Sequence, residues 1–127
     1  MDSATVELVR QRSAHRCPQS ASVLRFHIEH IIARQHGGSD DAANLALACP
    51  ECNYQKGTNL TGIDPDTGNV TPLFHPRHEW WEAHFKRDGA RLMGITAIGR
   101  TTVWLLAMNT GDRLRWREML LRLGRLE

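Results

Sequence analysis

The first half of the chain alternates short apolar runs with polar segments. Residues 22–28 alternate and are rich in Val, Leu and Phe, which predicts a β-strand. A second apolar run at residues 45–48 predicts another strand, and the segment 37–41, Gly-Gly-Ser-Asp-Asp, predicts a loop between them. Pro50 suits the first position of a short helix and Gly57 suits its end. The predicted order is strand, loop, strand, helix.

Capping residues and spacing predict the flanking elements. Residues 3–13 begin with a capping serine and carry valines at helical spacing, so we expect a short helix. Residues 61–76 are rich in turn-forming residues and predict a connector, whereas residues 78–87 predict a helix. Two strands joined by a turn are expected within residues 91–109, followed by a helix capped by Asp112.

Length and composition indicate one α+β globular unit. The chain has 127 residues, of which 41% are hydrophobic and 24% charged, values that argue against disorder. We expect a core in residues 1–60 and an extension in residues 61–127 that packs on it, with the plan helix, hairpin, helix. No apolar run approaches the ~20 residues of a membrane span and the start lacks the pattern of a secretory signal, so a cytoplasmic protein is expected.

The basic residues are almost all arginine. The formal net charge is only +2, but 14 of the 16 basic residues are arginine and two are lysine. Arginine binds phosphate through paired hydrogen bonds, so a nucleic-acid partner is compatible with this bias. The codon preference of a GC-rich genome explains it equally well.

Imidazole, carboxylate and thiol groups are concentrated in residues 26–57. Glu29 stands among isoleucines, where an isolated carboxylate is costly, so we expect a cation beside it, with Arg25 as one candidate. An imidazole such as that of His30 can accept a proton at neutral pH. The pair Cys49 and Cys52, in a reducing compartment, indicates metal or redox chemistry before a disulfide.

These residues carry a resemblance to a known family. The run Glu29-His30-Ile31-Ile32, the Gly37-Gly38 loop, Asn44-Leu45-Ala46-Leu47 and the segment Cys49-x-x-Cys52-Asn53-x-x-Lys56-Gly57 resemble the HNH endonucleases. The resemblance implies a ββα-metal core, in which two strands and a helix surround one divalent ion, and the hydrolysis of phosphodiester bonds in DNA. It covers roughly the first half of the chain.

The resemblance also implies a role for each matching residue. His30 would be the general base, Asn44 would tie the loop and orient the histidine, and Glu29 with Asn53 would bind Mg²⁺ or a similar ion. Such an ion prefers oxygen ligands and keeps positions for water and phosphate. This interpretation requires the side chains at positions 29, 30 and 53 to face one cavity.

Strand geometry complicates this arrangement. In a regular strand Glu29 and His30 point to opposite faces, and His27 shares a face with Glu29. The family ends or bends the strand at this point. Without the bend, His27 and Glu29 would form the metal pair, and His27 otherwise packs as a strand residue.

Two further residues are candidates for substrate binding. Lys56 lies one helical turn from Cys52 and would reach a phosphate oxygen, or else remain solvated before Gly57. His36 precedes the glycine pair and would touch substrate at the mouth of the site, or else lie on the surface.

The cysteines resemble an incomplete zinc site. Cys49 and Cys52 supply half of a structural zinc site, and relatives supply the other half from a second Cys-x-x-Cys near the amino end. Here only Cys17 stands at that place. Zinc bound by Cys17, Cys49 and Cys52, with His15 or water as fourth ligand, and an empty site are both compatible with the sequence.

The sequence therefore predicts a metal-dependent HNH endonuclease acting on DNA without strong base specificity. The alternative is a degenerate, non-catalytic module that binds nucleic acid or protein. A redox protein using Cys49 and Cys52 is a weaker alternative, because no βαβ pattern surrounds the pair.

Overall fold

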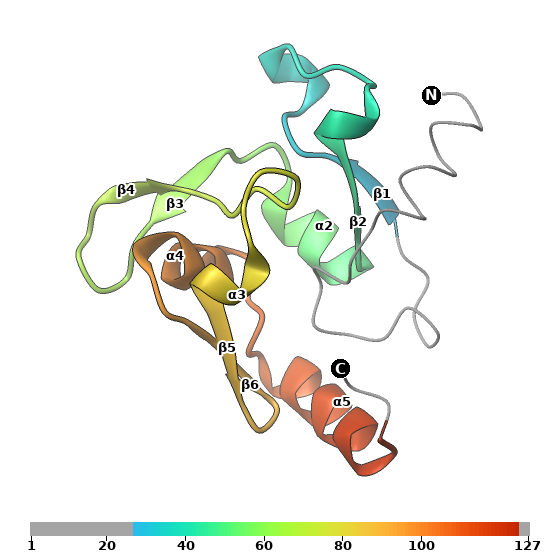
Figure 1. Cartoon of the computed structure of the whole chain (residues 1–127), viewed down its shortest axis with the longest axis vertical. Coiled ribbons are helices and arrows are strands. Elements are labelled where there is room, and N and C mark those ends of the chain that lie inside the picture. Colours follow the sequence, from blue (N-terminus) through green and yellow to red (C-terminus); the bar gives the residue numbers. More distant parts are fainter. Residues whose placement is uncertain (1–26, 125–127) are drawn as a thin grey trace.

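The computed structural model describes residues 27–124, and the predicted helix at residues 3–13, Arg25 and Cys17 lie outside this range. The first half contains an antiparallel hairpin of β1 (His27–His30) and β2 (Leu45–Ala48), followed by helix α2 (Pro50–Lys56) (Figure 1). The connection between the strands holds two single turns of 3₁₀ helix, η1 (Arg34–His36) and η2 (Ala42–Asn44). The predicted second strand and the helix closed by Gly57 are confirmed.

The second half consists of small hairpins and helices. Its elements in chain order are β3 (Thr61–Ile63), β4 (Val70–Pro72), α3 (Trp81–His84), β5 (Phe85–Asp88), β6 (Arg91–Gly94), α4 (Ala97–Leu105) and α5 (Gly111–Arg122). Strands β3 and β4 pair with each other, as do β5 and β6, and both pairs are antiparallel. The described part of the chain is therefore a mixed α+β structure, as predicted.

Several predictions for the second half were wrong. The expected connector at residues 61–76 contains the β3–β4 hairpin. The expected helix at residues 78–87 is a single turn, because the chain continues into β5 and turns back at Gly89, whose φ is +59°. Asp112 lies in the first turn of α5, whose N-cap is Thr110.

The second of the two strands expected within residues 91–109 is the helix α4. The Thr96 side chain caps α4 by accepting a hydrogen bond from the Gly99 amide. The hydroxyl of Thr102 donates to the Ile98 carbonyl and accepts from the Phe74 amide. These bonds hold a β-branched segment in a helix, against its intrinsic preference for a strand.

A shared core joins the two halves. Buried residues from the β2–α2 segment pack with buried residues of the extension, in a cluster of Ala48, Cys49, Cys52, Phe74, Phe85, Leu92, Leu106 and Met108. Trp81 stacks on Phe85 with ring centroids 4.0 Å apart at the edge of this cluster. The core therefore fixes the extension against the end of β2 and the start of α2.

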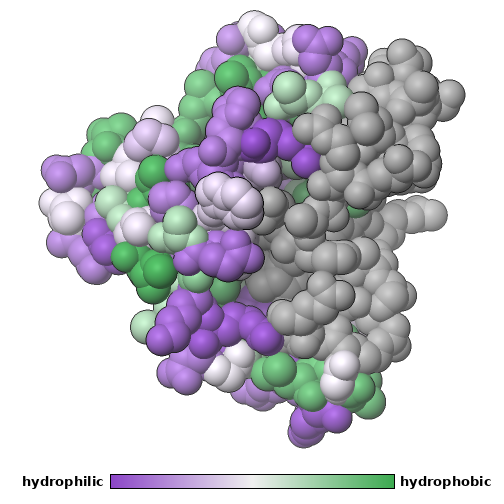
Figure 2. Space-filling view, in the orientation of Figure 1, coloured by the Kyte–Doolittle hydropathy of each residue, from purple (hydrophilic) through white to green (hydrophobic). Residues whose placement is uncertain are grey.

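The coloured part of the face shown in Figure 2 is mostly hydrophilic, and its hydrophobic residues form small separate patches. Trp80 and Trp104 are nevertheless 79% and 69% exposed. No helix within residues 27–124 combines the length and apolar character needed to cross a membrane.

Candidate functional site

The strand β1 presents its side chains to two different surroundings. All four of its residues pair regularly with β2, from His27 opposite Ala48 to His30 opposite Leu45. Regular pairing sends alternate side chains to opposite faces. His27 and Glu29 therefore face α2, whereas His30 faces the loop that follows β1.

His30 is held by an aspartate from that loop. Its Nε2 lies 2.7 Å from Oδ1 of Asp40, and the guanidinium of Arg34 donates to both oxygens of the same carboxylate at 3.0 Å. The hydrogen bonds from His30 and then Arg34 lower the pKa of Asp40 to about 2. Asp40 is therefore an ionised hydrogen-bond acceptor at neutral pH.

The side chain of Asn44 connects the two ends of the loop. Its Nδ2 donates to the carbonyls of Ile32 and Ser39 at 2.9 and 2.8 Å, and its Oδ1 accepts from the Ile32 amide at 2.8 Å. Gly38 passes so close that an added Cβ would lie 1.7 Å from the Ile32 carbonyl oxygen. A side chain at position 38 would therefore disrupt the loop that Asn44 holds.

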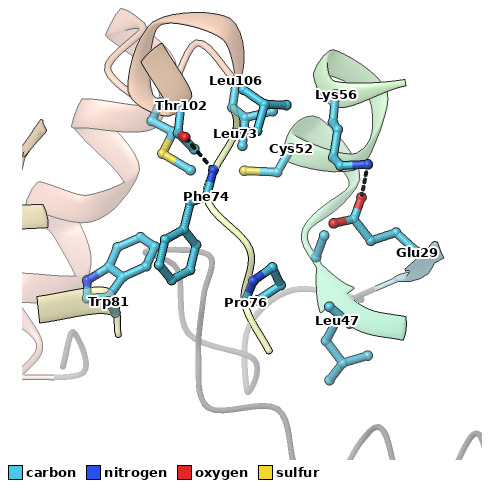
Figure 3. A pocket seen from close by; sticks show the side chains of 13 residues that line it. Glu29, Leu47, Cys52, Lys56, Leu73, Phe74, Pro76, Trp81, Thr102 and Leu106 are labelled. Atoms are coloured by element: carbon cyan, nitrogen blue, oxygen red, sulfur yellow. Dashed lines mark hydrogen bonds and ion pairs between the residues drawn. The ribbon is translucent and has the colours of Figure 1, made fainter. Parts of the chain in front are cut away.

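Glu29 faces a lysine inside the protein. Its Oε2 lies 3.9 Å from Nζ of Lys56, and Figure 3 shows the two groups pointing toward each other from β1 and α2. Lys56 is only 7% exposed, and its Nζ also donates to the carbonyls of His30 and Ile31 at 3.3 and 3.0 Å. The cation expected beside Glu29 is thus Lys56, and its enclosed amino group faces Glu29 and two backbone carbonyls, which does not favour the predicted contact with phosphate.

A small cavity of about 50 Å³ lies beside this pair. Glu29 and Lys56 line it together with apolar groups of the hairpin and the extension, including Leu73, Phe74 and Leu106 (Figure 3). Burial raises the pKa of Glu29 to about 7 from an ordinary value of 4.5, although the charge of Lys56 lowers it. The Glu29 carboxylate is therefore destabilised near neutral pH.

This shift predicts how Glu29→Gln changes stability. Because folded Glu29 holds its proton more tightly than the unfolded chain does, it makes the free energy of unfolding fall as pH rises from about 4.5 to about 7. Glu29→Gln should remove this contribution. The free energy of unfolding of the variant minus that of the wild type should therefore be more positive at pH 8 than at pH 4, by of order 1–3 kcal/mol. Urea unfolding of both proteins at several pH values, in the presence of a metal chelator, checks this. Free energies of unfolding that change with pH in the same way in both proteins would contradict it.

Asn53 pairs with His27 on the same side of β1. The Nδ2 of Asn53 lies 3.2 Å from Nδ1 of His27. Within the layer between β1 and α2, two pairs thus stand in parallel, His27 with Asn53 and Glu29 with Lys56. His36 lies on the surface with its Nε2 3.1 Å from the Thr58 carbonyl, and stays a candidate for substrate contact.

The expected convergence of Glu29, His30 and Asn53 on one cavity is not found. The structure brings Glu29 and Asn53 to the same layer, but each contacts another side chain, and His30 faces the opposite way because β1 does not bend before its last residue. No three His, Cys, Asp or Glu side chains within residues 27–124 gather closely enough to hold an ion. A carboxylate and an amide oxygen fit a hard divalent ion in kind, but their arrangement here does not form a ready-made site.

Cys49 and Cys52 lie at the start of α2, both buried. The Cys49 sulfur accepts a hydrogen bond from the Cys52 amide and so caps the helix. The Nη2 of Arg113, from α5, donates to the sulfurs of Cys52 and Cys49 at 2.9 and 3.4 Å. The two thiols are suitable zinc donors in kind, and Arg113 attaches α5 to the place where they meet.

Asp40 and Arg113 were not predicted as partners of these groups. Asp40 is one of two adjacent acids in the loop after the glycine pair. Sequence alone could have suggested a loop acid in this place as a hydrogen-bond partner of a histidine. Arg113 lies 61 residues from Cys52 among several arginines, so no spacing distinguishes it.

Residues 15–59 match the family model of the HNH endonucleases. No curated protein and no solved structure matches the chain. The match includes β1, β2, α2 and the loop that Asn44 ties, and HNH nucleases act on nucleic acid, typically with a divalent metal. Residues 15–59 of this chain are an HNH endonuclease domain.

Proposed function

We propose that the protein is an endonuclease that hydrolyses phosphodiester bonds in DNA with a divalent ion, and that His30 activates the attacking water. The observation that carries the proposal is the state of His30 within the HNH domain. Its Nε2 is bound to Asp40, and its Nδ1 makes no hydrogen bond to any residue between 27 and 124. A neutral imidazole held in this way offers one nitrogen as a proton acceptor.

Other residues support the reaction around His30. Asn44 fixes the loop, and Lys56 holds the backbone at the end of β1 through the carbonyls of His30 and Ile31. Glu29 and Asn53 contact Lys56 and His27 and would have to leave these partners to hold the ion, which would stabilise negative charge on the phosphate and on the departing oxygen. With Lys56 enclosed, the exposed guanidinium of Arg34 is the group that we assign to phosphate contact.

A second candidate function is a non-catalytic module that binds nucleic acid. The observation that favours it is the separation of Glu29, His30 and Asn53 into different surroundings. Arginine-rich surfaces bind phosphate without any reaction, and such binding weakens steeply with salt.

Supercoiled plasmid distinguishes the two functions. We expect the purified chain to convert supercoiled plasmid to the nicked form with Mg²⁺ or Mn²⁺, and to stop when EDTA is added, because the domain would need the ion to stabilise charge on phosphate. Activity should return when excess Mg²⁺ is restored. Retarded migration of DNA in a gel without cleavage by any metal would contradict the nuclease and support the binding module.

A further inference from the structure

The loop acid Asp40 is positioned from both sides. The Asn44 side chain binds the carbonyl of Ser39, and the Asn44 amide binds the carbonyl of Asp41 at 2.8 Å. The Asn44 carbonyl in turn accepts from the Ile31 amide at 2.8 Å, next to His30. One residue therefore anchors the backbone beside both members of the His30–Asp40 pair.

The carboxylate of Asp40 is held in place by Arg34 as well. Arg34 reaches both oxygens through Nη2 at 3.0 Å, and its Nε lies 3.2 Å from Oδ1. Two parallel contacts of this kind fix the orientation of a carboxylate plane. Oδ1 therefore faces Nε2 of His30 in a defined direction.

The chemistry of this pair determines which imidazole nitrogen carries the proton. An ionised carboxylate can only accept hydrogen bonds, so Nε2 of His30 must donate. In the neutral imidazole the lone pair then lies on Nδ1. We infer that Asp40 is a positioning residue that fixes His30 in the Nε2–H tautomer and so assigns the role of proton acceptor to Nδ1.

The inference about activity depends on the proposed function, but the tautomer does not. It can be read in the metal-free protein by ¹⁵N NMR of the imidazole at a pH where His30 is neutral. Asp40→Asn should introduce the Nδ1–H tautomer, because an amide can donate to Nε2, and should lower the nicking rate roughly 10- to 100-fold. Asp40→Glu, which keeps a carboxylate, should retain the wild-type tautomer and most of the rate.

Asp41→Asn is the matched control. Asp41 is the adjacent exposed acid, and its side chain makes no capping hydrogen bond, so the same change of charge should leave both tautomer and rate unaltered. An unchanged tautomer in Asp40→Asn overturns the inference, whether or not the rate falls. If the wild type does not nick DNA, the proposed function fails, while the NMR result still decides the role of Asp40.

Discussion

His30→Ala should lower the rate of plasmid nicking by about 10²- to 10⁴-fold, the usual contribution of a general base. The substitution removes the only imidazole bound to Asp40 within residues 27–124 and leaves β1 paired with β2 through its backbone. Stability should change little, because the His30–Asp40 pair is at the surface of the loop and partly exposed. Initial rates of nicking, with unfolding curves for each variant, measure both effects.

Substitutions of two other histidines serve as controls for His30→Ala. His78→Ala removes an exposed imidazole that stacks on His75 in the extension, and it should nick like the wild type. His27→Ala removes the partner of Asn53 and tests the other face of β1. Equal activity of His30→Ala and the wild type would reject His30 as the base, and selective loss in His27→Ala would move the reaction to the face toward α2.

The core of the HNH domain was predictable because its signals are local. The apolar run before Cys49, the proline after it and Gly57 define β2 and α2 without reference to any distant residue. Asn44 was identified differently, through the resemblance of its segment to the HNH endonucleases. Strand periodicity also indicated that Glu29 and His30 would diverge, and the structure follows the periodicity.

The extension was less predictable because tertiary contacts override local preference there. Residues 97–105 are rich in β-branched side chains, yet they form α4, where the backbone approaches so closely that a Cβ on Gly99 would lie 2.1 Å from the His84 carbonyl oxygen. Trp81 and Phe85, four residues apart, do stack, but the pairing of β5 with β6 ends the helix at His84. Neither contact is visible in a local pattern.

The partners of the site residues could not be predicted from the local sequence either. Sequence indicated that Glu29 needs a cation, and its spacing from Lys56 along the chain gave no reason to pair them. The pairing follows from the packing of α2 against β1, which puts Asn53 and Lys56 on the same helix face. A lysine that looked available to a phosphate is consequently an internal residue.

Lys56→Met should destabilise the fold by about 3 kcal/mol at pH 8, because it leaves a buried carboxylate and two carbonyls without their donor. Methionine preserves much of the side-chain volume, so packing against the cavity changes little. The loss should be smaller at pH 5, where Glu29 is protonated and carries no charge to neutralise. Urea unfolding at both pH values measures the difference.

Lys86→Met is the natural control, since Lys86 is the only other lysine in the chain and lies exposed on β5. We expect it to change the free energy of unfolding by less than about 0.5 kcal/mol. In the double variant Glu29→Gln/Lys56→Met, the cost of losing Lys56 should fall at pH 8, because the charge that Lys56 neutralises is gone. If Lys56→Met costs the same in the wild type and in Glu29→Gln, Lys56 acts through the carbonyls of His30 and Ile31 alone. If Lys56→Met changes the free energy of unfolding as little as Lys86→Met does, Lys56 has no role in holding α2 on β1.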